Sequence, residues 1–158
     1  MRQSVPLALA ALVTVALASG CGPGVRIETP PGFATLEKQT EYVYRSASAD
    51  GVVIAVRREK NEPKGNLDFW SDALDRRLRN NRYNPDGKPV DLHAASGQPG
   101  RKMRYTREDQ GRKYRFWAAV FVTEDKVWVI EAGGDEERFT GKTADAITRA
   151  MESIVIDS

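Results

Sequence analysis

Apolar residues recur at the spacing of an α-helix in two parts of the chain. The first set predicts a helix over residues 66–80 that begins at the N-cap Asn66, and it consists of Leu67, Trp70, Leu74 and Leu78. The second set predicts a helix over about residues 143–153 with Thr143 as its cap, and it consists of Phe139, Ala146, Ile147, Ala150, Met151 and Ile154. Each helix therefore has one apolar face that has to pack against the rest of the protein.

The other apolar positions lie in short runs that alternate with polar residues and end at glycine, proline, asparagine or aspartate. These runs predict seven strands, at residues 25–28, 41–47, 52–58, 90–96, 101–107, 113–123 and 126–132. Short, turn-prone links join the last four runs, so we expect an antiparallel meander. The run 113–123 has apolar residues on both faces, which is typical of a central strand. The sequence thus predicts an α+β fold in which two main helices pack on an antiparallel β-sheet of about six to seven strands.

The chain begins with an apolar segment that is too short to cross a membrane. Residues 5–18 are uncharged and follow Arg2. At about 1.5 Å per residue they reach about 21 Å, against a hydrocarbon core of ~30 Å. A positive start, an apolar middle and small residues at the end predict a secretory signal peptide over residues 1–20.

The only cysteine of the chain, Cys21, directly follows this segment. The sequence LASGC at residues 17–21 resembles the lipobox of bacterial lipoproteins. That resemblance implies cleavage before Cys21, a lipid with palmitate-type chains on its sulfur and, because Gly22 follows, sorting to the outer membrane in a Gram-negative cell. Acyl chains stabilise attachment to a membrane by about 0.8 kcal/mol per buried methylene. Cleavage after Ala18, which leaves Cys21 as a free thiol, is the alternative.

Composition excludes some classes of protein but names no partner. The 158 residues include 24 Lys or Arg and 22 Asp or Glu, so the formal net charge is only +2. One cysteine and one histidine exclude a disulfide scaffold and a zinc site built from these ligands within one chain. A mature chain of this size buries enough surface to fold without either.

Basic residues concentrate in one predicted hairpin. Against Glu108 and Asp109 it holds seven bases: Arg101, Lys102, Arg104, Arg107, Arg112, Lys113 and Arg115. A solvated sheet face explains such a run, and the alternative is a patch that binds anionic lipid head groups, lipopolysaccharide or acidic glycans. Because an exported protein meets no cytoplasmic nucleic acid, we expect no nucleic-acid partner.

Motifs for catalysis or cofactor binding are weak. Residues 134–143 end in Gly-Lys-Thr like a phosphate-binding loop, but six residues instead of four separate Gly134 from Gly141. Asp91 and His93 share one face of a strand, yet the chain has no second histidine. We therefore predict no catalytic residue, no metal and no cofactor. The tryptophans lie within apolar periodic patterns that predict core positions: Trp70, Trp117 and Trp128.

The order of these features resembles the PsbP/DcrB-like superfamily. The resemblance covers residues 25–157 and lies in Pro-Pro-Gly-Phe at 30–33, the hairpin, the helix with LDFWSDALDRRL, the meander and the closing AITRAMESIVID. It implies a short tether at residues 21–24 and one domain over 25–158, in which helices pack on an antiparallel sheet.

The resemblance also implies a function, because members of this superfamily mostly bind or stabilise partners without catalysis. We therefore predict a non-enzymatic lipoprotein, anchored in the outer membrane and facing the periplasm, that acts as an adaptor for another envelope protein. The alternative is a carrier of a lipid or small ligand with a pocket between sheet and helices. An exposed apolar or aromatic patch favours the adaptor, and an enclosed apolar cavity favours the carrier. The sequence predicts no oligomeric state.

Overall fold

The computed structural model describes residues 24–37 and 41–157. The predicted signal peptide at residues 1–20, the lipidation site Cys21 and residues 22–23 of the tether lie outside this part of the chain. Among the residues described, no helix is long and apolar enough to span a membrane.

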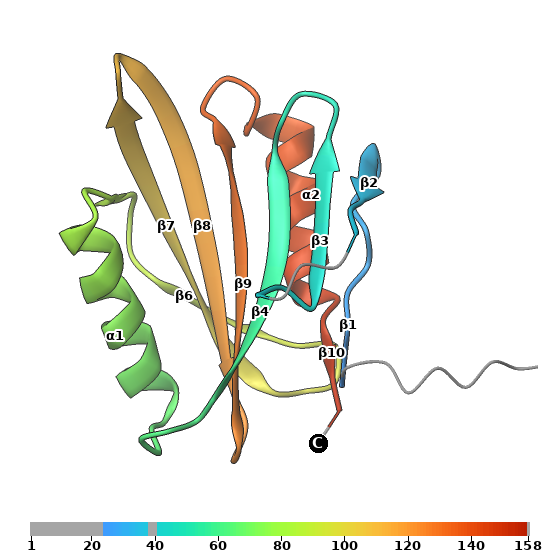
Figure 1. Cartoon of the computed structure of the whole chain (residues 1–158), viewed down its shortest axis with the longest axis vertical. Coiled ribbons are helices and arrows are strands. Elements are labelled where there is room, and N and C mark those ends of the chain that lie inside the picture. Colours follow the sequence, from blue (N-terminus) through green and yellow to red (C-terminus); the bar gives the residue numbers. More distant parts are fainter. Residues whose placement is uncertain (1–23, 38–40, 158) are drawn as a thin grey trace, which may run out of the picture.

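An eight-stranded antiparallel sheet forms the middle of the fold (Figure 1). From one edge its order is β2 (Phe33–Thr35), β3 (Tyr44–Ser48), β4 (Val53–Lys60), β9 (Lys126–Asp135), β8 (Arg112–Val122) and β7 (Pro99–Asp109). Two short strands pair with different parts of the outer edge of β7, namely β5 (Asn84–Pro85) and β6 (Val90–His93). Tight turns join β7 to β8 and β8 to β9, and β6 pairs antiparallel with β7, so β6 to β9 form the predicted four-strand meander.

A separate two-stranded ribbon joins the two ends of the described chain. β1 (Val25–Arg26) pairs antiparallel with β10 (Val155–Ile156). The amide of Asp157 also donates a hydrogen bond to the carbonyl oxygen of Gly24 at 2.9 Å. Both ends therefore lie side by side at one end of the molecule (Figure 1).

Helix α1 (Leu67–Asn80) packs on one face of the sheet, over β7 and β8. Its cap is the predicted one, because the side-chain oxygen of Asn66 accepts a hydrogen bond from the amide of Phe69 at 2.9 Å. Beneath the helix lies a small buried cluster: Leu78, Met103, Tyr105, Val120, Val127 and Val129.

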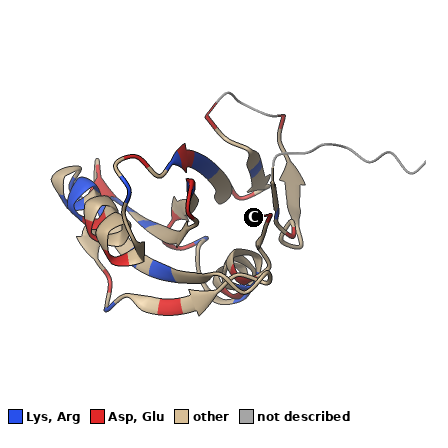
Figure 2. Ribbon diagram, turned by 90° about the horizontal axis from the view of Figure 1, so that it is seen from below, with Lys and Arg blue, Asp and Glu red and all other residues tan. Residues whose placement is uncertain are grey.

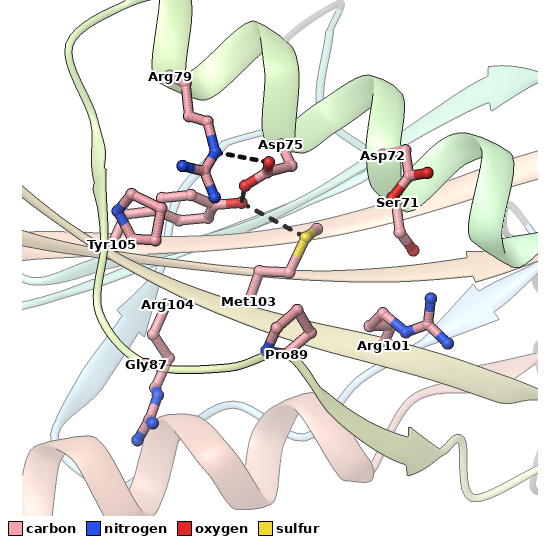
Figure 3. A pocket seen from close by; sticks show the side chains of 11 residues that line it. Ser71, Asp72, Asp75, Arg79, Gly87, Pro89, Arg101, Met103, Arg104 and Tyr105 are labelled. Carbon is pink, nitrogen blue, oxygen red and sulfur yellow. Dashed lines mark hydrogen bonds and ion pairs between the residues drawn. The ribbon is translucent and has the colours of Figure 1, made fainter.

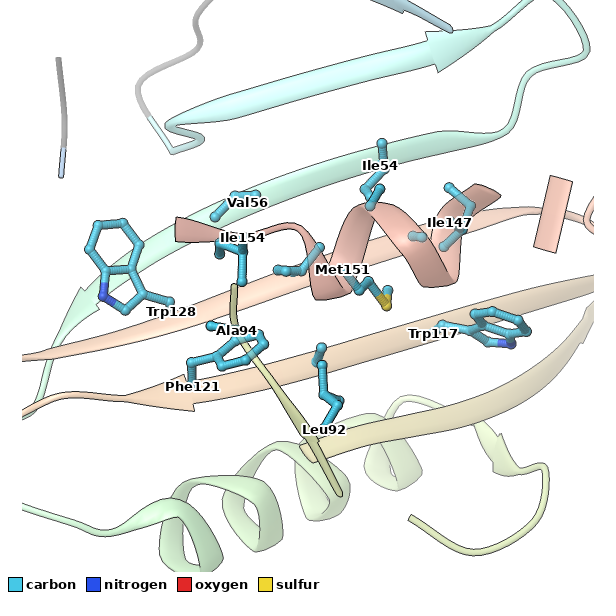
Figure 4. Close-up of a cluster of buried hydrophobic side chains, with 14 of the residues drawn as sticks. Ile54, Val56, Leu92, Ala94, Trp117, Phe121, Trp128, Ile147, Met151 and Ile154 are labelled. Carbon is cyan, nitrogen blue, oxygen red and sulfur yellow. The ribbon is translucent and has the colours of Figure 1, made fainter. Parts of the chain in front are cut away.

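Helix α2 (Gly141–Glu152) packs on the opposite face, where the larger core lies. Figure 4 shows side chains of this core gathered around α2, with α1 on the far side of the strands. On β8, Trp117 and Phe121 belong to the core under α2, whereas Val120 belongs to the cluster under α1. Strand β8 is therefore apolar on both faces, as predicted, and the α+β fold with two helices on an antiparallel sheet is confirmed.

The sequence-based predictions are wrong about the cap of α2 and miss three short strands. Helix α2 begins at Gly141 with Thr140 in the N-cap position, so Thr143 is not the cap. The amide of Thr143 instead donates to the carbonyl oxygen of Thr140 at 3.2 Å, inside the first turn. Three short strands, β2, β5 and β10, are absent from the prediction and make the described sheets wider than expected. Each has only two or three residues, too few to show an alternating pattern.

The three tryptophans differ in burial. Trp117 and Trp128 are core residues, as predicted, with exposed fractions of 7% and 2%. Trp70 is only half-buried, and its indole N–H donates to Asn61 Oδ1 at 2.7 Å. One side of Trp70 is therefore left to line the site described next.

Candidate functional site

Helix α1 covers only part of its face of the sheet. It contacts β5, β7 and β8, and a groove runs between the helix and the neighbouring strands β4 and β9. We call this hollow the α1 groove. Its central part has a volume of about 400 Å³ and is lined by Glu41, Tyr42, Arg57, Leu74, Arg77, Leu78, Asn81, Tyr83, Arg107, Phe116 and Glu131.

Two neighbouring hollows extend the α1 groove, one along the helix and one along strands β7, β8 and β9. One, of about 110 Å³, shares with the central part the residues Arg57, Leu74 and Arg77. The other, of about 330 Å³, shares with it the residues Tyr83, Arg107 and Phe116. Because they share walls, the three hollows form one elongated groove that is open to solvent.

Aromatic side chains form one wall of the groove. The ring centroids of Tyr83 and Phe116 lie 5.0 Å apart. The guanidinium carbon of Arg107 lies 5.4 Å from the centroid of the Tyr83 ring, within the range of a cation–π contact. This wall therefore combines an apolar surface with a positive charge held at its edge.

The floor of the groove holds an ion pair between Arg57 of β4 and Glu131 of β9. Arg57 Nε donates to Glu131 Oε2 at 3.1 Å, and Arg57 Nη2 donates to Oε1 at 2.6 Å. The two side chains are only 16% and 18% exposed. Arg57 Nη1 also donates to Glu59 Oε1 at 2.6 Å. Burial opposes the charge of Arg57, but its contacts with Glu131 and Glu59 outweigh that effect and raise the pKa of Arg57.

The ion pair predicts that replacing Glu131 destabilises the protein more than replacing Glu59. Glu131→Ala should lower the free energy of unfolding by about 1–3 kcal/mol, because it leaves a mostly buried guanidinium with one partner. Glu59→Ala is the matched control, since Glu59 is 50% exposed and its loss should cost less than about 1 kcal/mol. Urea denaturation measures both values. Equal losses would show that Glu131 does not have this special role.

Arg77 differs from the neighbouring guanidiniums on α1 and in the groove. It is exposed on α1, and among the described residues its guanidinium has no acidic partner. In contrast, Arg79 Nε bonds to Asp75 at 2.7 Å, and Arg107 Nη2 lies 3.9 Å from a carboxylate oxygen of Asp109. Arg77 is therefore available to an acceptor on a ligand.

A smaller polar pocket, of about 120 Å³, lies on the other side of α1 against β7 (Figure 3). The Tyr105 hydroxyl donates to Asp75 at 2.7 Å, and Arg79 binds the same carboxylate. Burial raises the pKa of Tyr105, and the hydrogen bond to Asp75 raises it further. The buried Ser71 hydroxyl, which has no partner among the described residues, is a single neutral group on its wall. Asp75 is thus paired with Tyr105 and Arg79 here, whereas Arg77 in the α1 groove has no acidic partner among the described residues.

The seven bases of the predicted anion patch lie on both faces of the β7–β8 hairpin. Arg101 reaches the face of α1, where it bonds to Asp91 at 2.9 Å and to Asp68 at 2.6 Å, and these bonds raise its pKa. Lys102 reaches the face of α2, where its Nζ lies 3.3 Å from Thr148 Oγ1, and burial lowers its pKa. One hairpin thus presents its charges in two directions.

Acidic neighbours take up part of the charge in the rest of this hairpin. Arg112 lies 3.1 Å from a carboxylate oxygen of Asp135, and Arg115 lies 3.5 Å from one of Glu136. Lys113 is exposed, and Figure 3 shows Arg104 on the side of β7 that faces away from α1. The anion-binding role of these seven residues stays a prediction. Of the seven, Arg107 alone lines the central part of the α1 groove.

Asp91 and His93 are both exposed on β6. The carboxylate of Asp91 already accepts a hydrogen bond from Arg101. Within residues 24–37 and 41–157, no three His, Cys, Asp or Glu side chains are placed to hold a metal ion.

Sequence reasoning missed the residues on the floor of the α1 groove, although a signal was present. Arg57 directly follows the apolar run VVIAV, and Glu131 stands inside the apolar run VWVIEAG. A charge in such a run needs a partner when the strand is buried. The two positions are 74 residues apart, so their pairing depends on β4 lying beside β9 and not on any local pattern.

Comparisons with known proteins identify the fold. No model of a protein family matches this sequence, and no curated protein sequence matches it. Among solved structures, LpqN of Mycobacterium tuberculosis, described as involved in cell envelope biogenesis, is similar with a TM-score of 0.71 and 12% identity, over 85% of this chain and 83% of LpqN.

Two further structures share the architecture. The cyanobacterial PsbP protein of Synechocystis, CyanoP, has a TM-score of 0.57 and 13% identity, over 96% of this chain and 99% of its own. The Ran-binding protein Mog1p of Saccharomyces cerevisiae has a TM-score of 0.56 and 14% identity, over 85% of this chain and 91% of its own. The chain therefore has a fold of the PsbP and LpqN type, as its resemblance to PsbP-like domains implies.

Proposed function

We propose that this chain is a bacterial envelope lipoprotein, anchored through Cys21, whose domain binds another envelope protein in the α1 groove without catalysing a reaction. With Gly22 after the cysteine, the anchor lies in the outer membrane of a Gram-negative cell, and the domain faces the periplasm. In a cell with one membrane, the domain faces outward.

The α1 groove is the observation that carries this proposal. It is elongated and open, with aromatic rings on one wall and the uncommitted guanidinium of Arg77 on the other. Interfaces of proteins are rich in aromatic residues and arginine, which supply most of the binding energy. A carrier of a lipid would instead enclose its ligand in an apolar cavity.

Two of the structural neighbours support the proposal at the level of the fold. LpqN is described as involved in cell envelope biogenesis, and Mog1p is described as a Ran-binding protein. The same architecture therefore occurs in an envelope protein and in a protein that binds another protein.

Crosslinking in intact cells tests whether a partner lies in the groove. A photoreactive benzoylphenylalanine at Asn81, an exposed residue of the groove, should give a discrete adduct with one envelope protein. The same amino acid at Arg149, an exposed residue of α2 on the opposite face, is the matched control and should not give that adduct. Adding Tyr83→Ala to the Asn81 variant should reduce the yield, because it removes part of the aromatic wall. Identical adducts from both positions, or none from Asn81, would contradict binding in the groove.

A further inference from the structure

We infer that the occupant of the α1 groove is an extended peptide segment that places one carboxylate on Arg77, next to an apolar side chain on the aromatic wall. This chemistry rests on the proposed function, in which the groove binds another protein. Shape, charge and the distribution of apolar surface each contribute to it.

The shape of the groove fits an extended chain. The part of the groove that lies beside α1 runs from Trp70 to Asn81, eleven residues apart in the chain, and the third hollow lies outside this part. At ~1.5 Å per residue of helix, this distance is about 16 Å. An extended peptide rises ~3.3 Å per residue, so about five residues fill the part of the groove beside α1.

Charge selects a carboxylate on the occupant. Arg57 already has both oxygens of Glu131 and one of Glu59, so its guanidinium is occupied. Arg107 lies 3.9 Å from a carboxylate oxygen of Asp109 and over the ring of Tyr83, so the positive group left for a ligand in the central part is Arg77. A guanidinium binds a carboxylate through two parallel hydrogen bonds, which makes a single acidic side chain a good match for Arg77.

Stabilisation of the end of helix α1 does not by itself explain why Arg77 faces the groove without an acidic partner. Basic residues stabilise the last turn of a helix, and Arg77 and Arg79 both lie there. Arg79, however, is paired with Asp75, while Arg77 lines the groove. Its sequence neighbour Arg76 is equally exposed but lines none of the three hollows. Arg76 and Arg77 therefore form a matched pair on the same turn.

Acidic residues at the rim limit how much negative charge the occupant can carry. Glu41 lines the central part of the groove, and Glu59 lines the adjoining hollow of about 110 Å³. A run of several acids would lie against these two carboxylates. Leu74 and Phe116 offer apolar contacts between the charged groups. The expected segment is thus one acid flanked by aliphatic or aromatic residues.

A library of random seven-residue peptides displayed on phage tests this chemistry on the protein purified from cells that express the full chain. Selected peptides should share one Asp or Glu beside an apolar residue. Arg77→Gln should weaken their binding about tenfold or more, because a hydrogen-bonded charge pair is lost. Arg76→Gln should change binding less than about twofold, because that side chain points out of the groove. Arg77→Lys, which keeps the charge but not the fork of donors, should give an intermediate loss.

The results distinguish failure of the carboxylate assignment from failure of the proposed function. Selection of neutral or basic peptides, selection of no peptide, or equal effects of the Arg76 and Arg77 variants would overturn the carboxylate assignment. If neutral peptides still compete with the adduct formed at Asn81, the groove remains the binding site and only the chemistry of the occupant is wrong. If no adduct forms at Asn81 in cells, the proposed function itself fails. Circular dichroism of the Arg77 variants confirms that lost binding is not lost folding.

Discussion

Cys21→Ser should move the protein from the membrane fraction to the soluble fraction. Serine cannot form the thioether that holds the lipid, and the single cysteine of the chain leaves no second site for it. Several acyl chains, at about 0.8 kcal/mol per buried methylene, make release of the lipidated protein negligible. Fractionation with salt and carbonate washes, together with incorporation of labelled palmitate, measures both attachment and its cause.

A neighbouring substitution provides the control for this experiment. Gly22→Asp keeps the cysteine, so the protein should stay in the membrane fraction and keep the label. In a Gram-negative cell it should move from the outer to the inner membrane, because the residue after the cysteine directs sorting. Retention of the Cys21→Ser protein after both washes, or palmitate labelling without Cys21, would contradict lipidation at this residue.

Ile147→Ala should lower the free energy of unfolding by about 2–5 kcal/mol. Ile147 has no exposed surface and lies on α2 within the large core. Removing three of its carbon atoms loses apolar burial and leaves a cavity that the surrounding side chains fill only in part. Chemical denaturation of the Cys21→Ser protein, which is soluble if the first prediction is correct, gives the value.

An exposed apolar residue provides the comparison. Val90 on β6 is 48% exposed, so Val90→Ala should cost less than about 1 kcal/mol. Similar losses in the two variants would mean that α2 does not cover the sheet as described. Leu74→Ala should lie between them, because Leu74 is half-buried at the edge of the α1 groove.

The sequence was informative wherever a pattern extended over several residues. The spacing of Leu67, Trp70, Leu74 and Leu78 predicted α1, because an amphipathic helix repeats its apolar positions, here over about three turns, and Asn66 before them predicted the cap. The run through Trp117 and Phe121 predicted a strand with two covered faces. In both cases local periodicity carries the information that burial later confirms.

The sequence was uninformative wherever structure depends on distant partners. Phe33–Thr35 is a strand because β3 lies beside it, and three residues alone show no period. The bases between Arg101 and Arg115 appeared as one patch in the sequence, but the alternation of strand faces separates Arg101 from Lys102. The α1 groove itself depends on how far the helix extends across the sheet, which no local pattern records.

The ribbon of β1 and β10 determines where a label can be attached. Gly24 and Asp157 are hydrogen-bonded neighbours, and Gly24 follows Cys21, the proposed anchor residue, by three positions, a reach of about 10 Å. With a lipid on Cys21, a fluorescent protein fused behind Asp157 would lie close to the bilayer. The turn at Gln110 between β7 and β8 is at the far end of the molecule (Figure 1), and α1 carries both acidic and basic residues (Figure 2). An epitope inserted there would project away from the bilayer and leave both termini undisturbed.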